Sequence, residues 1–211
     1  MKKILVIGTG GLAREFTSYF SSSSEQIEIV GFSSTNHGEH SSFELPGVLF
    51  DGDVSPDSVG TDEAVIAIGS PAVKKRISEE LKARGFTFPS FVHPSSVCSD
   101  EANLGEGVVV SPNCVISPNV AVNPFSYINF SCGVGHDAII GSYVQINPGT
   151  QLGGGSIIGD GCLIGSGSTV LQGVQIGASA TIGAGSVVFS RVAENATMMG
   201  NPAKRMRAFE K

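Results

Sequence analysis

Residues 134–164 read VGHDAIIGSYVQINPGTQLGGGSIIGDGCLI, and an aliphatic side chain stands at every sixth position of this stretch. The same spacing extends in both directions, from Val92 to Val188, with Cys98 as the one exception. A small side chain follows four residues after most members of the series, as at Ala138. A helix would place apolar residues three and four positions apart, and an amphipathic strand would alternate them. The six-residue period instead predicts short strands joined by corners and stacked into a parallel β-helix.

The repeat is never interrupted, so we expect between five and six coils from Val92 to about Val192, with the aliphatic series inside. The cysteines fit this frame. Three of them fall at the small inward position and Cys98 falls at the aliphatic one; the three are Cys114, Cys132 and Cys162. Small buried apolar residues are therefore a better interpretation of the cysteines than disulfides or metal ligands.

Composition excludes several classes of function. The 211 residues are enough for one large or two small domains, and their formal net charge of −6 argues against nucleic acid as a partner. No apolar run approaches the roughly 20 residues that cross a bilayer. The opening stretch Met1–Gly8 is basic at its start but too short in apolar residues for a signal peptide. We expect a cytoplasmic protein without membrane insertion.

The N-terminal part follows a different pattern. A buried strand is followed by the glycine turn Gly8-Thr9-Gly10-Gly11 and by a helix, and a polar loop, Ser33–Ser42, follows the second strand. This order of elements is typical of a Rossmann-like α/β domain, whose turn admits phosphate oxygens at a helix N-terminus. The expected strands are Lys3–Ile7, Gln26–Phe32 and Glu63–Ile68, and the expected helices are Leu12–Phe20 and Pro71–Arg84.

The acidic residue that a dinucleotide site places after the second strand is missing, because Ser33 and Ser34 stand there. A dinucleotide cofactor is therefore disfavoured. A mononucleotide or nucleotide-sugar site fits better, and so does a purely structural α/β cap on the β-helix. We expect a domain boundary between residues 91 and 92, which gives domains 1–91 and 92–211, the second with a C-terminal tail.

Positive charge is concentrated at the C-terminal end. Residues 92–190 contain no Lys or Arg, and the cations of the last segment are Arg191, Lys204, Arg205, Arg207 and Lys211. A polyanionic ligand on the β-helix would need its countercharges from this tail or from a neighbouring subunit. The alternative is a solvated tail that covers the last coil.

His136 is the histidine that lies within the repeat, and it points outward because it comes two residues after the inward Val134. An outward histidine is often only a solvated surface residue. Here Asp137 is adjacent and can orient the imidazole and raise its basicity, and Gly133 and Gly135 leave the backbone open. Such a pair suits the removal of a proton from a hydroxyl or an amine. A zinc site is poorly supported, because it needs three or four ligands and no second histidine is near.

The hexad array resembles the left-handed parallel β-helix of the hexapeptide-repeat acyltransferases. The whole chain is similar to their sialic acid O-acetyltransferase and bacillosamine N-acetyltransferase-like branch, which carries a small Rossmann-like domain ahead of the β-helix. The motifs that carry the resemblance are Gly8–Glu15, Ala67–Gly69, His93–Ser95, Gly135–Asp137, Ile146–Gly149 and Gly200–Lys204.

This resemblance implies roles for individual residues. His136 matches the general base and Asp137 its acidic partner, and backbone N–H groups near Gly154 would stabilise the oxyanion. The family forms trimers with acetyl-CoA between neighbouring β-helices; the matching groove residues are Gln145, Gly154, Ser166 and Ala184, with Lys204 and Arg205 near the phosphate end. The positions that match the nucleotide-sugar site are Gly10, Gly11, Leu12, Ser33, Ser34 and Gly69. Relatives often have two aspartates in place of Ser33 and Ser34, some have His in place of Leu12, and some have His in place of Gln145.

The resemblance thus predicts an acetyl-CoA-dependent acetyltransferase, without a metal. It would act on an amino or hydroxyl group of a sugar or nucleotide-linked sugar in bacterial surface polysaccharide or glycan biosynthesis. The rival hypotheses are a non-catalytic trimer that binds a sugar nucleotide and a zinc enzyme similar to the γ-carbonic anhydrases. The sequence leaves open which sugar and nucleotide are bound, whether N or O is acylated, and whether the donor is acetyl or a longer acyl group.

Overall fold

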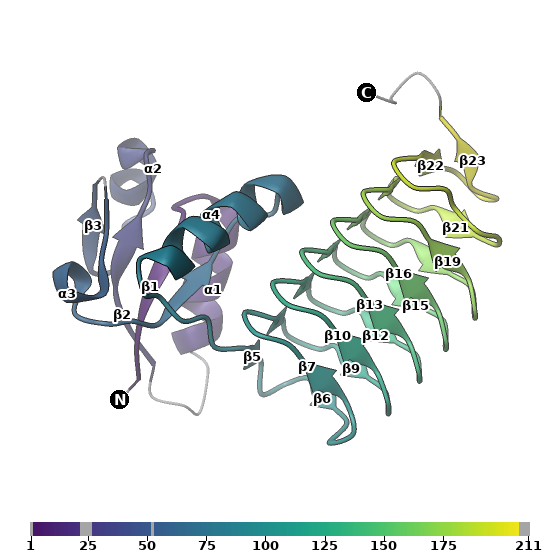
Figure 1. Cartoon of the computed structure of the whole chain (residues 1–211), viewed down its shortest axis with the longest axis horizontal. Helices are drawn as coiled ribbons and strands as arrows, with labels where there is room; N and C mark the ends of the chain where they lie inside the picture. Colours follow the sequence, from purple (N-terminus) through teal and green to yellow (C-terminus); the bar gives the residue numbers. More distant parts are fainter. Residues whose placement is uncertain (1, 22–26, 52, 207–211) are drawn as a thin grey trace. The chain divides into compact units, whose positions relative to one another are not determined.

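The computed structural model describes residues 2–21, 27–51 and 53–206. It divides into two compact units, Met1–Pro89 and Ser90–Lys211. Strands flanked by helices form the first unit, and a stack of short strands forms the second (Figure 1). The predicted combination of an α/β unit and a parallel β-helix is confirmed. The assignment of separate binding roles to the two parts stays a prediction.

The first unit is a parallel sheet with the strand order β3-β2-β1-β4. Its strands are β1 (Lys2–Ile7), β2 (Ile27–Ser33), β3 (Val48–Phe50) and β4 (Ala64–Ile66), and its helices are α1 (Gly11–Ser21), α2 (His37–Ser42), α3 (Pro56–Val59) and α4 (Pro71–Ala83). Residues 4–7 of β1 are all buried, as in a strand covered on both faces. The chain runs outward from β1 to β3 and returns to β4 on the other side of β1. Open α/β sheets bind ligands outside the carboxyl ends of the strands where the strand order changes direction, which here is between β1 and β4.

The structure corrects the expectation for residues 33–42. The polar sequence predicts a loop there, but residues 37–42 form α2. Tertiary contacts hold this short helix, since the ring of His40 packs edge-on against Phe32 at 5.6 Å. The expected elements also lack β3 and α3, although α3 carries a local signal: Ser55 caps it in a reciprocal capping box with Ser58. Gln26, the expected start of the second strand, lies outside the described residues.

The second unit is a β-helix built from three sheets. The first sheet contains β5 (Phe91–Val92), β8 (Val109–Val110), β11 (Tyr127–Ile128), β14 (Gln145–Ile146), β17 (Leu163–Ile164), β20 (Thr181–Ile182), β22 (Thr197–Met199) and β23 (Lys204–Arg205). The second sheet contains β6 (Val97–Cys98), β9 (Val115–Ile116), β12 (Gly133–Val134), β15 (Gln151–Leu152), β18 (Thr169–Val170) and β21 (Val187–Val188). The third sheet contains β7 (Asn103–Leu104), β10 (Ala121–Val122), β13 (Ile139–Ile140), β16 (Ile157–Ile158) and β19 (Gln175–Ile176). The chain therefore completes six turns between β5 and β22, the upper end of the predicted number.

The interior is built from two kinds of column. The aliphatic residues of the six-residue series form the core, and most of them are completely buried. The small residues fill the corners, where their hydroxyls donate to a carbonyl of the next coil. Ser126 Oγ lies 2.6 Å from the Gly141 carbonyl oxygen, and Ser168 Oγ lies 2.9 Å from that of Gly183. Cys114, Cys132 and Cys162 occupy these same inward positions and are free thiols. These bonds satisfy the hydroxyls of Ser126 and Ser168 within the stack, whereas the buried Ser156 Oγ has no hydrogen-bond partner among the described residues.

Each corner also fixes the backbone. From Gly107 to Gly185, every sixth residue has a positive φ, including non-glycine residues such as Asn119 and Asp137. The glycines directly after aliphatic positions are needed for another reason, which is lack of space. A Cβ on Gly135 would lie 2.5 Å from the backbone nitrogen of Gly154. A corner thus has one position where successive coils approach closely and another where a left-handed residue turns the chain.

Among the described residues, no helix is long and apolar enough to cross a membrane.

The adjacent residues Ile139 and Ile140 test the inward register of the repeat. Ile140→Ala should lower the free energy of unfolding by about 2–5 kcal/mol, because it opens a cavity in a closed core. Ile139→Ala should cost less than about 1 kcal/mol, since its side chain is 43% exposed. Denaturant titrations at one protein concentration measure both values. Equal losses in the two variants would contradict the register.

Candidate active site

The candidate base lies at the corner between the second and third sheets, where β12 ends and β13 begins. His136 Nδ1 is 2.7 Å from Asp137 Oδ2, and both side chains are more than half exposed. The two side chains therefore form a hydrogen-bonded pair at the surface. This arrangement leaves Nε2 as the ring nitrogen that can meet a substrate.

Asp137 is held from two sides. It occupies a left-handed corner position with φ 60°, and Asn119, one coil earlier, donates from Nδ2 to its Oδ1 at 3.1 Å. The hydrogen bonds from His136 and then from Asn119 keep the pKa of the Asp137 carboxyl below its ordinary value. The carboxylate is therefore ionised and directed toward the imidazole at neutral pH.

Gly154 makes room for the imidazole. It stands one coil beyond His136 at the same corner, and a Cβ there would lie 2.7 Å from Nε2. The Gly155 N–H donates to the His136 carbonyl at 2.7 Å, so the backbone of the two coils is also joined here. The open side of Nε2 thus faces a stretch of backbone without side chains, as a site for a reacting carbonyl requires.

The other residues predicted for the CoA groove lie at different places around the β-helix. Ser166 and Ala184 are exposed at the corner between the first and second sheets. Gln145 is on β14 of the first sheet, and Lys204 and Arg205 are exposed on β23. In a three-sided coil, the first sheet lies opposite the corner that carries His136. One protomer therefore brings His136, Asp137 and Gly154 together but does not bring Gln145 to them.

The sequence pattern does not reveal a row of polar side chains on the first sheet beside Gln145. The Tyr127 hydroxyl lies 2.7 Å from the Ser111 hydroxyl and 3.2 Å from Asn129 Oδ1, to which it donates. Gln145 Nε2 donates to Asn147 Oδ1 at 3.3 Å. A signal exists for the two asparagines, since they stand directly after an aliphatic position, where several coils have glycine.

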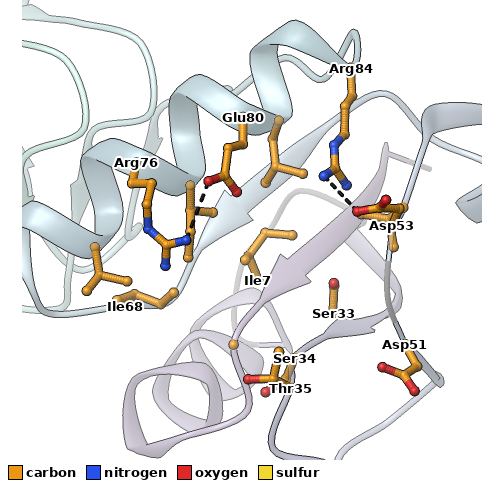
Figure 2. A pocket seen from close by; sticks show the side chains of 15 residues that line it. Ile7, Ser33, Ser34, Thr35, Asp51, Asp53, Ile68, Arg76, Glu80 and Arg84 are labelled. Atoms are coloured by element: carbon orange, nitrogen blue, oxygen red, sulfur yellow. Dashed lines mark hydrogen bonds and ion pairs between the residues drawn. The ribbon is translucent and has the colours of Figure 1, made fainter.

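A second candidate site is a pocket of about 410 Å³ in the α/β unit. It lies at the ends of β1 and β2 and is bordered by α4 (Figure 2). Gly8, Ser33 and Ser34 line it, as expected of the glycine turn and of the two serines. Gly10, Gly11, Leu12 and Gly69 are not among its lining residues. The polar side chains that line it are Ser33, Ser34, Thr35, Asp51, Asp53, Arg76, Glu80 and Arg84.

The glycine turn is tied to the segment after β2 through Thr9. The Thr9 hydroxyl is buried and lies 3.0 Å from Glu39 Oε2, to which it donates, and 3.0 Å from Ser34 Oγ. Ser34 Oγ also accepts the Asn36 N–H at 3.0 Å. Ser34 is thus held in place by the protein, while Ser33 has no such bond among those described.

The charged side chains at the pocket are not predicted by the sequence pattern. Arg84 Nη2 is 2.8 Å from Asp53 Oδ1, and Arg76 Nη1 is 3.4 Å from Glu80 Oε1 (Figure 2). Asp51 lines the same pocket directly after β3. The available signal is an acidic residue immediately after the apolar run Val48–Phe50, the pattern of a strand that ends at a ligand site.

Within the part of the chain that the structure describes, His, Cys, Asp and Glu side chains form no group of three or more that could hold a metal ion.

Two family models match the chain. Residues 3–81 match the PglD N-terminal domain, and residues 137–172 and 155–190 match the bacterial transferase hexapeptide (six repeats). The α/β unit is therefore similar to the PglD N-terminal domain, and part of the β-helix is similar to the hexapeptide repeats of bacterial transferases. The resemblance noted in the sequence is confirmed. Among curated protein sequences, no match to the chain was found.

Solved structures are similar over nearly the full chain. PerB from Caulobacter crescentus, in complex with CoA and GDP-perosamine, has 24% identity over 98% of both chains and a TM-score of 0.78. The acetyltransferase domain of PglB from Neisseria gonorrhoeae has 25% identity over 98% of this chain and 100% of that chain, with a TM-score of 0.69. WeeI from Acinetobacter baumannii has 23% identity over 98% of this chain and 100% of that chain, with a TM-score of 0.70.

The hydrogen bond from Asn119 can be tested alone. Asn119→Gly keeps a residue that accepts the positive φ but removes the amide, so the pKa of Asp137 should rise toward its ordinary value. Asn113→Gly is the matched control, because Asn113 has the same φ of 59° at another corner. Carbon NMR of the Asp137 carboxyl across a pH titration measures the shift. An unchanged pKa in Asn119→Gly would show that the bond does not hold the carboxylate.

Proposed function

We propose that the chain is an acetyl-CoA-dependent acetyltransferase that acetylates an amino or hydroxyl group of a nucleotide-linked sugar. The observation that carries this proposal is the exposed His136–Asp137 pair, with Nε2 beside the open backbone at Gly154. Two similar structures support the donor and the acceptor: the PglB domain has been solved with acetyl coenzyme A, and PerB with CoA and GDP-perosamine. We place the reaction in the cytoplasm, as a step of surface polysaccharide or glycan biosynthesis.

In the proposed mechanism His136 is a general base and transfer is direct. Nε2 takes the proton of the acceptor N–H or O–H while that atom attacks the thioester carbonyl carbon. The N–H of Gly154 stabilises the oxyanion of the tetrahedral intermediate, since the N–H of Gly155 is already bonded to the His136 carbonyl. The C–S bond then breaks, and the imidazolium returns its proton to the CoA sulfur. Throughout, Asp137 accepts the hydrogen bond from Nδ1 and stabilises the charged ring.

A covalent route through cysteine is disfavoured by the position of the thiols. Cys114, Cys132 and Cys162 are buried inside the β-helix, away from the face that carries His136. Burial raises the pKa of the Cys162 thiol to about 11, so the nucleophilic thiolate is scarce near neutral pH.

We further propose that the working unit is a homotrimer. The predicted groove residue Gln145 and the proposed base His136 lie on opposite sides of one coil, so a groove lined by both needs a second copy. Exposed apolar side chains on the second sheet offer a surface to bury between copies; they include Val97 and Val115. Residues 92–190 have no cation, so Lys204 and Arg205 supply countercharge for the phosphates of CoA.

His136→Ala should lower the rate of acetyl transfer by about 10²–10⁴-fold, because it removes the base. The thermal midpoint and CoA binding should change little, since the side chain contributes nothing to the core. Asp137→Asn should lower the rate less. Thiol release from acetyl-CoA, with a panel of nucleotide-linked and free amino sugars, measures the transfer. A loss of stability in parallel with activity would mean that these residues are structural.

Gly154→Ala tests the same site without substituting His136 or Asp137. Its methyl group would displace the imidazole, so the rate should fall in the native background but not further in His136→Ala. Native protein that binds nucleotide sugar but neither binds acetyl-CoA nor transfers acetyl would favour the non-catalytic alternative.

Sedimentation velocity at micromolar concentration should show a trimer. The expectation follows from the separation of Gln145 and His136 in one chain and from the exposed apolar side chains of the second sheet. A monomer with full activity would contradict it, because one chain does not bring Gln145 to His136.

A further inference from the structure

The hydroxyl of Ser156 is an exception among the inward polar groups of the β-helix. Hydroxyls and thiols at equivalent inward positions donate to the backbone carbonyl 15 residues ahead, in the next coil; examples are Ser96, Ser126 and Ser168. Ser156 is completely buried, yet its Oγ has no hydrogen-bond partner among the described residues. A buried hydroxyl without a partner destabilises the folded protein, so its presence at this corner requires a reason.

The backbone carbonyl of Gly153 is the matching exception among the acceptors. Equivalent carbonyls at other corners accept a hydroxyl from the preceding coil, as those of Gly141, Gly165 and Gly183 do. For Gly153, the residue 15 positions earlier is Ala138, which has no hydroxyl to donate. The Gly153 carbonyl accepts the N–H of Ser156 at 3.2 Å, and a carbonyl oxygen has a second lone pair. An acceptor with capacity for one more bond thus lies beside the unbonded hydroxyl.

Rotation about one side-chain bond can join the two groups. Thr150 stands at the same inward position of the preceding corner, and its hydroxyl donates at 2.8 Å to the carbonyl of Asn147, three residues earlier. Gly153 is likewise three residues before Ser156, and their main chains are already in contact. A change of the Ser156 rotamer therefore brings Oγ to the Gly153 carbonyl without moving the backbone.

The Gly153 carbonyl and the Gly154 N–H belong to the same planar peptide unit. That N–H is the oxyanion donor of the proposed mechanism, so the inference rests on the proposed function. A hydrogen bond to the carbonyl oxygen polarises the peptide and makes its N–H a stronger donor. The gain is largest when negative charge stands on the N–H side, which is the situation in the transition state.

We propose that Ser156 is a positioning residue for acetyl transfer, whose hydroxyl turns onto the Gly153 carbonyl as negative charge develops at the Gly154 N–H. In the resting protein the hydroxyl is buried without a partner, and it gains its hydrogen bond in the transition state. An interaction made only in the transition state raises kcat and leaves substrate binding unchanged. Ser156 acts from inside the coil and does not touch the substrate.

Ser156→Thr and Ser156→Val in the full chain form a matched pair, because the two side chains have nearly the same shape and only threonine has a hydroxyl. The equivalent inward positions one coil away on either side of Ala138 and Ser156 hold Val120 and Val174, so the column accepts this shape. Ser156→Val should lower kcat about 3–10-fold, the factor of one net hydrogen bond. The KM for acetyl-CoA and for the acceptor should change less than about twofold. Ser156→Thr should keep kcat within about twofold of the native value.

Ser156→Ala adds no atoms to the core and separates the loss of the hydroxyl from a change in packing. It should lower kcat as Ser156→Val does, while the thermal midpoint stays the same or rises, because an unbonded buried hydroxyl is removed. Ser168→Ala is the control, since Ser168 Oγ already donates to the Gly183 carbonyl at 2.9 Å in the resting protein. It should lower the thermal midpoint and leave kcat unchanged.

Equal kcat values in Ser156→Thr and Ser156→Val would overturn the inference, and so would a parallel loss of thermal midpoint and kcat in Ser156→Ala. In either case the proposed function would still stand if His136→Ala lowers the rate. Native protein that transfers no acetyl group to any acceptor of the panel would overturn both.

Discussion

The β-helix depends on the close approach of successive coils at the position directly after the aliphatic residue, which is glycine in several coils. At Gly135 there is no space for a side chain against the next coil, and the aliphatic and small positions of each six-residue repeat are buried in the core. Chemistry is therefore confined to the few outward positions. His136 and Asp137 are two of them, and their backbone is set by the same corner geometry that every other coil uses. The site needs no special backbone of its own.

This constraint explains why the sequence predicts one unit better than the other. In the β-helix, each inward position is specified by a repeat with no insertion, so counting in sixes along the sequence is enough to assign the buried series from Ile116 to Val188. The same count places His136 on the surface. The α/β unit has no such repeat, and α2 forms where tertiary contacts to Phe32 and Thr9 override a polar sequence.

The sequence also predicts some contacts of the candidate site better than others. The pairing of His136 with Asp137 is predicted because the two residues are adjacent in the sequence. Asn119 donates to Asp137 from 18 residues earlier in the chain. This distance equals one coil, so the contact can be expected only once the three-sheet coil is known. Asp51 and Arg84 come to the pocket from different elements, and a single sequence holds no periodicity that joins them.

Each coil of the β-helix contacts only the coils on either side, and the coil of His136 lies in the interior of the stack, between β11 and β14. In such a one-dimensional array, opening begins at the ends, where a coil has one neighbour instead of two. Amide hydrogens around His136 should therefore be among the slowest to exchange, while those near β5 and β22 exchange first. The corner that carries His136 is therefore protected from local opening by its position inside the stack, because the terminal coils open first.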